Sequence, residues 1–236
     1  MQNLTLLSLD TSTEACSVAL FHRGEKTHIN ELAQRTHTKR ILPMIDEILA
    51  NSGLRLNQVD ALAFGRGPGS FTGVRVGAGI AQGLAFGADL PVIPISNLTA
   101  MAQAAFELHQ AENVVAAIDA RMNEVYFSQL MREKVRSDVE EFFQWREIIT
   151  EQVCSPEQAI KQLRDDNAFR VGTGWAAYSQ FTEKDLTSSD IALPNVLYML
   201  ELARVEYLQK RTISALEIEP IYLRNEVTWK KLPGRE

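Results

Sequence analysis

The stretch GRGPGSFTGVRVG, residues 65–77, holds five of the 13 glycines in this chain of 236 residues. It follows the apolar run VDALAF (59–64), which predicts a buried strand, and it leads into small residues over 73–87, which predict a helix. A glycine-rich turn between a strand and a helix can bind an anion through free backbone N–H groups and the helix dipole. Alternatively, Gly67 and Gly69 supply turn angles and Ser70 or Thr72 caps the helix. Neither a Walker A nor a GxGxxG pattern is present, so both interpretations stay open.

Apolar periodicity on either side of this stretch predicts alternating strands and helices. Strands are expected over 4–9, 16–21, 27–32 and 90–96, with Gly24 in the turn between the second and the third. An apolar face that contains Ile41, Ile45 and Ile48 predicts a helix over 38–52, which Thr36 or Thr38 would cap. Pro43 must then lie in the first turn of that helix or kink it. Ser96 is a suitable cap for a further helix over 97–110.

The order of strands and helices restarts near residue 113. Strands are predicted over 113–120, 124–131, 140–145 and 169–174, with a short helix after Ser155 and a long amphipathic helix over 194–210. Each half opens with a strand, an aspartate (Asp10 or Asp119) and a hairpin, which indicates an internal duplication. We therefore predict an α/β protein of two lobes, residues 1–98 and 99–236, in which the helix over 194–211 packs back on the first lobe.

The composition is typical of a globular protein, with 45% hydrophobic and 23% charged residues. The net charge of −6 disfavours a protein that grips nucleic acid through its own surface, so any contact with RNA is expected to be indirect. Cys16 and Cys154 lack the spacing of a disulfide framework or a zinc site. The first residues are not typical of a signal peptide, and no run reaches the ~18 apolar residues of a membrane span. We expect a cytoplasmic protein without membrane association.

Small polar residues and glycines from three turns could together line a nucleotide or phosphate cleft. They are Asp10, Thr11, Ser12, Gly67, Gly69, Ser70, Thr72 and Asp119. Hydroxyls and backbone N–H groups at such turns can donate hydrogen bonds to phosphate oxygens. The alternative is that the aspartates and Thr11 satisfy only their own turns.

Groups suited to catalysis are scarce in the sequence. The four histidines form no HExxH pattern, and Ser70 does not lie in a GxSxG elbow. No catalytic residue and no metal ligand is therefore assigned. An ATP-dependent phosphotransferase of the sugar-kinase type stays open as an alternative, because of the two hairpins that follow an aspartate.

The helix predicted over 73–87 carries glycines that need an explanation. Each glycine inside a helix costs about 0.5–1 kcal/mol relative to alanine. Close approach of another helix would offset that cost, because a missing side chain lets two backbones come together. The neighbour could be the helix over 38–52 of the same chain or a helix of a second subunit.

Four stretches together carry a family resemblance: MQNLTLLSLDTSTEACSVAL (1–20), GRGPGSFTGVRVG (65–77), IDARMNEVYF (118–127) and PIYLR (220–224). They resemble the bacterial TsaB (YeaZ) family, subunits of the machinery that makes threonylcarbamoyladenosine in tRNA. The resemblance covers essentially the whole chain and implies two duplicated RNase H-like lobes of the actin, sugar-kinase and Hsp70 (ASKHA) type. The catalytic relative TsaD holds a metal through an HxxxH pair. Here His37 is followed four positions later by Ile41, so the resemblance implies no metal site.

The resemblance also implies a role and partners. It predicts a scaffold subunit without activity of its own, which binds TsaD, works with the small ATPase TsaE and forms a homodimer. No cofactor is expected to be required, and ATP or ADP is expected at the junction with TsaD. A peptidase is a further alternative, because TsaD-like proteins have carried the label glycoprotease.

The resemblance therefore predicts which proteins pack against the glycine-rich helix over 73–87. The surface expected to bind TsaD and to self-pair comprises Ile41, Ile45, Gly73, Arg75, Val76, Gly77, Ile80, Ala81 and Leu84. Gly77→Leu is expected to disrupt both contacts and to leave a folded lobe.

Overall fold

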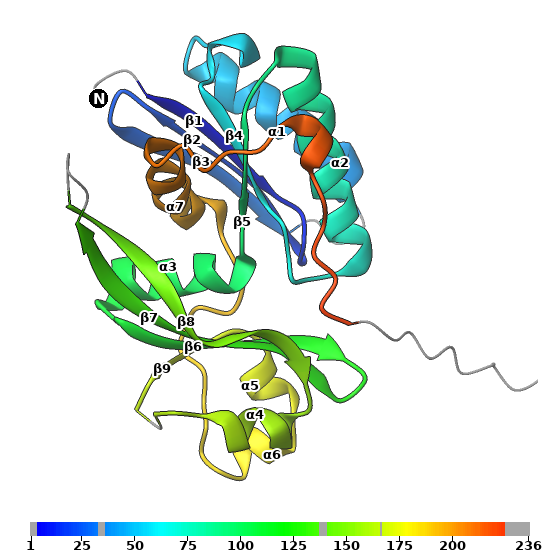
Figure 1. Cartoon of the computed structure of the whole chain (residues 1–236). Coiled ribbons are helices and arrows are strands. Elements are labelled where there is room, and N and C mark those ends of the chain that lie inside the picture. Colours follow the sequence, from blue (N-terminus) through cyan, green and yellow to red (C-terminus); the bar gives the residue numbers. More distant parts are fainter. Residues whose placement is uncertain (1–3, 33–35, 137–140, 166, 225–236) are drawn as a thin grey trace, which may run out of the picture.

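The chain folds into two β-sheets with helical layers between them and on both outer faces (Figure 1). The computed structural model describes residues 4–32, 36–136, 141–165 and 167–224. Among these residues no helix is long and apolar enough to cross a membrane.

The first sheet combines an antiparallel meander with parallel strands, in the order β3-β2-β1-β4-β5. Its strands are β1 (Thr5–Asp10), β2 (Ala15–His22), β3 (Glu25–Leu32), β4 (Ala61–Gly65) and β5 (Val92–Ile95). In the β2–β3 turn, Arg23 and Gly24 have φ angles of 52° and 85°, as a tight hairpin requires. The strands predicted in this half are therefore confirmed.

Two long helices cover the outer face of this sheet: α1 (His37–Asn51) and α2 (Phe71–Ala88). A short 3-10 turn, η1 (Leu56–Gln58), follows α1. Thr36 occupies the cap position of α1 without a side-chain hydrogen bond, and Pro43 lies beyond the first turn on the exposed side. At α2 the cap is Ser70, whose hydroxyl accepts the Gly73 N–H at 3.4 Å.

The second sheet repeats the start of the first, with an antiparallel meander followed by a parallel strand, in the order β8-β7-β6-β9. Its strands are β6 (Asn113–Arg121), β7 (Glu124–Arg136), β8 (Glu141–Cys154) and β9 (Phe169–Val171). The strand predicted over 140–145 is too short, because β8 continues to Cys154. As an edge strand with two register shifts against β7, β8 buries few residues and shows no clear alternation in sequence.

Three short helices cover the outer face of the second sheet: α4 (Pro156–Gln162), α5 (Gly174–Ala177) and α6 (Ser179–Thr182). Ser155 caps α4 by accepting the Gln158 N–H, and Pro156 follows it, as predicted. Trp175 and Phe181 are fully buried in this layer, with ring centroids 4.8 Å apart.

Helices α3 (Asn97–His109) and α7 (Val196–Leu208) lie between the two sheets. Ser96 caps α3, as predicted, by accepting the Thr99 N–H at 3.2 Å. The long helix predicted near the C-terminus is present as α7, but it does not expose the polar face that an amphipathic helix would have. Most of α7 is buried or half-buried, because it packs on β1, β2, β4 and β5 and also contacts α3. Beyond α7, Ile213 pairs with Val92 and a 3-10 turn, η2 (Ala215–Glu217), lies against α2.

Candidate functional site between the two sheets

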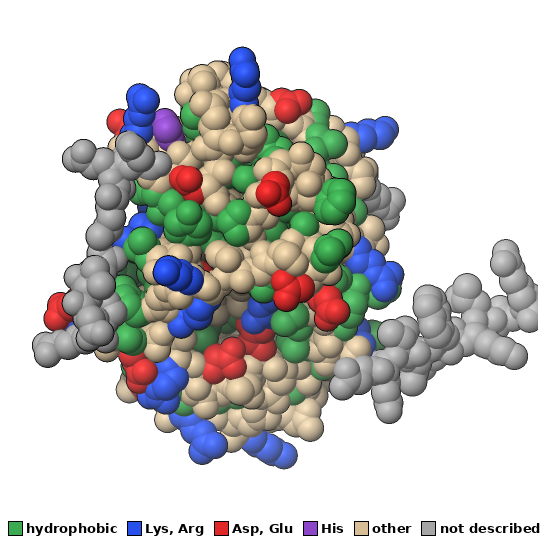
Figure 2. All heavy atoms as spheres, turned by 45° about the horizontal axis from the view of Figure 1, so that its top comes forward, with side chains coloured by type: hydrophobic (Ala, Val, Ile, Leu, Met, Phe, Trp, Pro, Cys, Tyr) green, Lys and Arg blue, Asp and Glu red, His purple; other side chains and the backbone are tan. Residues whose placement is uncertain are grey.

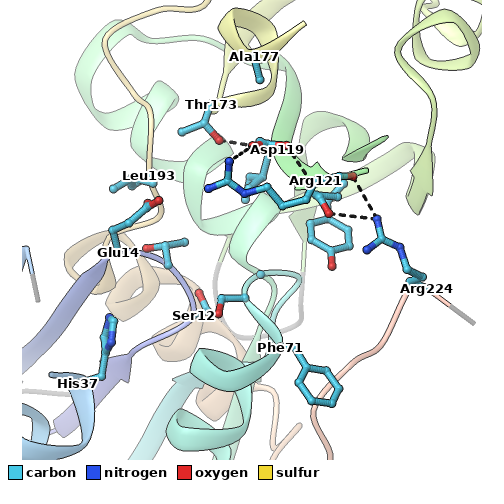
Figure 3. A pocket seen from close by; sticks show the side chains of 16 residues that line it. Ser12, Glu14, His37, Phe71, Asp119, Arg121, Thr173, Ala177, Leu193 and Arg224 are labelled. Atoms are coloured by element: carbon cyan, nitrogen blue, oxygen red, sulfur yellow. Dashed lines mark hydrogen bonds and ion pairs between the residues drawn. The ribbon is translucent and has the colours of Figure 1, made fainter. Parts of the chain in front are cut away.

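A cavity of about 790 Å³ opens between the two sheets (Figure 3). The β1–β2 turn and the starts of α1 and α2 contribute Ser12, Thr13, Glu14, His37, Gly69, Ser70 and Phe71. The second half of the chain contributes the end of β6, Tyr126 of β7, Thr173, Ala177 and Leu193. Arg224, from the C-terminal segment, completes the lining.

Asp119 is the centre of a hydrogen-bonded cluster on the side of the second sheet. Its carboxylate accepts the backbone N–H of Arg121 at 2.8 Å and the hydroxyl of Tyr178 at 2.6 Å, and it pairs with the Arg121 guanidinium at 2.9 Å. Burial, followed by the bond to Asp119, raises the pKa of Tyr178 to about 12. Asp119 thus accepts a backbone hydrogen bond within its own turn, as the alternative interpretation expected, and it also borders the cavity.

The C-terminal segment reaches the same hairpin. The Arg224 guanidinium donates to Glu124 at 2.5 Å and to the backbone carbonyls of Ala120 and Arg121 at 3.0 and 3.3 Å. Both arginines at the cavity therefore already have carboxylate partners. A phosphate would have to compete with Asp119 and Glu124 for them, which weakens the case for an anion cradle.

On the opposite side the glycine-rich loop is held against the β1–β2 turn. The Ser70 N–H donates to the Ser12 carbonyl at 2.7 Å, and a Cβ on Gly69 would come within 2.5 Å of that same oxygen. Gly67 has a φ of 99°. The architectural interpretation of these glycines is therefore supported by their contacts.

Asp10 lies behind this wall and does not border the cavity. It is fully buried, and its carboxylate accepts the hydroxyl and the N–H of Ser12 at 2.9 and 3.3 Å. Burial raises the pKa of Asp10 to about 7. The neighbouring Thr11 is also buried and donates its hydroxyl to the Gly73 carbonyl at 2.7 Å.

The structure thus divides the residues predicted for a cleft. Ser12, Gly69, Ser70 and Asp119 meet at the cavity, whereas Asp10, Thr11, Gly67 and Thr72 are not part of its lining. The expectation for Asp10 and Thr11 needs correction, because both side chains point into the protein and hold the turn. Arg121 and Arg224 were missed, although both lie in stretches that carry the family resemblance.

The surface predicted for partner binding divides in the same way. Ile41, Ile45, Gly73, Gly77 and Ala81 are buried in the core of the first sheet, so they cannot contact a second protein in this conformation. Arg75 is exposed, and Val76, Ile80 and Leu84 are half-buried. The expectation for Gly77→Leu is corrected accordingly. A Cβ there would lie 3.0 Å from Thr11 Oγ1, so a leucine must displace the β1–β2 turn.

Three other glycines on α2 face outward. A Cβ on Gly79, Gly83 or Gly87 would meet nothing within 4 Å, and all three glycines are exposed. Phe86 lies among them with 71% of its surface exposed. Figure 2, in which the top of Figure 1 comes forward, shows hydrophobic side chains at the surface among scattered charged ones.

Comparison with known proteins identifies the family. A family model described as TsaD, tRNA N6-adenosine threonylcarbamoyltransferase, matches residues 26–230. A Haemophilus influenzae protein described as tRNA threonylcarbamoyladenosine biosynthesis protein TsaB is 93% identical over the full length of both chains. The chain belongs to the TsaB (YeaZ) family.

Further TsaB relatives agree with this placement and confirm the resemblance. The TsaB protein of Escherichia coli is 46% identical and covers 99% of this chain and 100% of its own. A solved Pseudomonas aeruginosa structure, described as an uncharacterized protein with similarity to peptidase YEAZ, matches with a TM-score of 0.83 at 40% identity. It covers 94% of this chain and 100% of its own, so the α/β fold is shared with a YeaZ-like structure.

Proposed function

We propose that this chain is a non-catalytic scaffold subunit in the machinery that attaches threonylcarbamoyl to tRNA adenosine next to the anticodon. It binds TsaD, the catalytic subunit, and stabilises its active conformation. A scaffold can do this only if it binds one conformation of TsaD more tightly than another. The relatives described as tRNA threonylcarbamoyladenosine biosynthesis proteins support the pathway.

We further propose that the two sheets are duplicated RNase H-like lobes of the ASKHA type. The support is the repeated topology, in which β2-β1-β4 of the first sheet corresponds to β7-β6-β9 of the second. The proposed boundary stays near residue 98, with α7 assigned to the first lobe, whose sheet it covers.

The observation that carries the scaffold proposal is the outward face of α2. Glycine is unfavourable inside a helix, and no contact within the described chain requires Gly79, Gly83 or Gly87. A helix of a partner could approach closely along this row, with Phe86 as an apolar anchor beside it. On the neighbouring helix α1, Leu42 and Pro43 are also exposed.

We assign this outward face to TsaD and to self-pairing alike, so homodimer and TsaD complex compete for it. TsaE joins the complex with TsaD. Contact with tRNA is indirect, consistent with the net charge of −6, and we place the complex in the cytoplasm.

The proposal requires no cofactor within this chain. ATP or ADP is assigned to the junction with TsaD rather than to the cavity, because Arg121 and Arg224 are already paired and Asp10 is buried. The same contacts give no support to a sugar-kinase-like phosphotransferase. Among the described residues, no group of three or more His, Cys, Asp or Glu side chains could hold a metal ion, and so none supports a metallopeptidase.

Gly83→Leu tests the outward face directly. The variant is expected to fold, because glycine is about 0.8–1 kcal/mol less favourable than alanine in a helix and leucine ranks close to alanine. It is expected to lose capture of TsaD, to elute as a monomer in size exclusion, and to lower tRNA modification in a mixture with TsaD and TsaE.

Lys161→Leu on α4 is the matched control, since it also places a leucine on an exposed helix, at the far end of the molecule. It should bind TsaD like the unaltered chain. The proposal fails if Gly83→Leu retains both self-pairing and TsaD capture.

A further inference from the structure

Two buried acceptor oxygens face the same side of Gly65, at the junction of β1, β4 and α3. A Cβ on Gly65 would overlap Asp10 Oδ1 and would lie 2.6 Å from Asn97 Oδ1. Both side chains are fully buried, and Asn97 Oδ1 has no hydrogen-bond partner among the described residues. A carboxylate and an amide oxygen are both acceptors, so they can lie near each other favourably only if a hydrogen or a cation lies between them.

The Asn97 amide cannot relieve this contact by turning over. Its Nδ2 donates to the Pro68 carbonyl at 3.1 Å and also to Ser12 Oγ, which fixes Oδ1 toward Asp10. On Asp10, Oδ2 accepts the Ser12 hydroxyl at 2.9 Å. Oδ1 accepts the longer and weaker bond from the Ser12 N–H at 3.3 Å, so it is the oxygen better placed to carry a proton.

We propose that Asp10 is a neutral carboxylic acid in the folded protein, and that its Oδ1–H donates a hydrogen bond to Asn97 Oδ1. The groups around it favour a proton over a charge. Ser17 of β2 pairs directly with Asp10, Gly65 lies beside it on β4, and Asn97 approaches from α3; all three are neutral.

Ionisable groups on the neighbouring strands and on α7 do not supply a counter-charge. Cys16 of β2 belongs to the core on the other face of the sheet, and burial raises the pKa of its thiol to about 11. Arg66, which follows Gly65, pairs instead with Glu151 of β8 at 2.9 Å. On α7, Arg204 pairs with Glu201 of the same helix at 2.8 Å. Burial without a positive partner is the condition that keeps a carboxyl protonated, and it raises the pKa of Asp10 to about 7.

The proton connects three segments that shape the cavity. Ser12 is bonded to Asp10 and holds Ser70 through its carbonyl, and the Asn97 N–H donates to the Gly67 carbonyl at 3.0 Å. With Asp10 protonated, the β1–β2 turn, the glycine-rich loop and the start of α3 are joined. Above neutral pH the carboxylate and Asn97 Oδ1 repel, and the joint loosens. The bond thus acts as a pH-sensitive lock on one wall of the cavity.

The stability consequence has a definite sign. The folded chain retains a proton that the unfolded chain releases above its ordinary carboxyl pKa near 4. This contribution to stability is complete below that pKa and is lost as pH rises through about 7.

The test compares Asp10→Asn with the unaltered chain in denaturant unfolding at pH 5 to 8. The amide N–H of the variant can donate to Asn97 at every pH. Relative to the variant, the unfolding equilibrium constant of the unaltered chain is expected to rise about tenfold for each pH unit up to neutrality. Asp60→Asn is the matched control, because the Asp60 carboxylate accepts the Thr5 N–H at 2.7 Å. The ratio of the unfolding equilibrium constants of the unaltered chain and Asp60→Asn should not rise tenfold with each pH unit.

Carboxyl carbon NMR of the unaltered chain provides a second measurement, which does not depend on folding of a variant. The carboxyl carbon resonance of Asp10, assigned through its own backbone signals, should keep the chemical shift of the protonated acid at pH 6. An Asp10 carboxyl that is ionised at pH 5 overturns the proposal. So does an Asp10→Asn variant that is as unstable as Asp10→Ala at every pH, because that result would mean a required negative charge.

Discussion

The glycines of α2 form two sets that differ in what lies over them. Gly73 and Gly77 face the β1–β2 turn, where a Cβ would meet Thr11. Gly79, Gly83 and Gly87 face outward, where a Cβ would meet nothing within 4 Å. The first set lets the helix start come close to its own sheet, and the fold accounts for it. A Cβ on the second set would meet nothing within the described chain, and we therefore propose that these glycines serve a contact outside it.

Gly73→Ala should produce the largest effect. Its Cβ would overlap the backbone carbonyl of Thr11, which cannot rotate away as a side chain could. The β1–β2 turn must then move, and the Thr11 hydroxyl loses its bond to the Gly73 carbonyl. We expect a loss of about 3 kcal/mol in the free energy of unfolding, measured by denaturant titration. Unchanged stability would remove the distinction between the two sets.

Thr11→Val sharpens the comparison by altering the other side of the same contact. The substitution keeps the shape but removes the hydroxyl that donates to the Gly73 carbonyl at 2.7 Å. A loss of about 1–1.5 kcal/mol is expected from a buried hydrogen bond. The loss of stability in the double variant with Gly73→Ala should be smaller than the sum of the two single losses, because both substitutions disrupt the same contact. Strict additivity in a double-mutant cycle would argue against that shared contact.

Gly83→Ala should have the smallest effect on stability, and in the opposite direction. Alanine fits the open space and lowers the entropy of the unfolded chain, so a gain of about 0.5–1 kcal/mol is expected. Thermal unfolding of the isolated chain is the measurement. A loss of stability would show that the outward glycines are also needed by the fold.

Local patterns predicted the elements well where the pattern had a single cause. Ile41, Ile45 and Ile48 repeat with helical spacing because they face one core, and Ser96 and Ser155 cap helices through bonds to residues three positions on. The extent of β8 and the burial of α7 on several sides were not predictable in this way. Hydrophobic periodicity arises when one face of an element is buried and the opposite face is exposed. An edge strand with mixed exposure and a helix covered on several sides both lack this difference between faces.

The candidate site was predictable only in part, for a related reason. Ser12, Ser70 and Asp119 follow strands or begin a helix, so their meeting follows from the topology. Whether an aspartate after a strand is exposed depends on what packs over it. Asp10 is covered by Asn97, 87 positions away in the chain, and Asp119 is not covered in this way. Arg224 reaches Glu124 across 100 positions, and no local pattern encodes that pairing.

The position of α7 also has a consequence for how the chain is made. The inner face of the first sheet, with Leu6, Ala63 and Ile93, is closed by Met199 and Leu200 of α7. During synthesis those strands leave the ribosome long before α7 does, and an apolar face without its cover is prone to aggregation. The first sheet can therefore complete its core only near the end of translation. A nascent chain stalled after residue 98 would be a client for chaperones that bind exposed apolar strands, rather than a folded half of the protein.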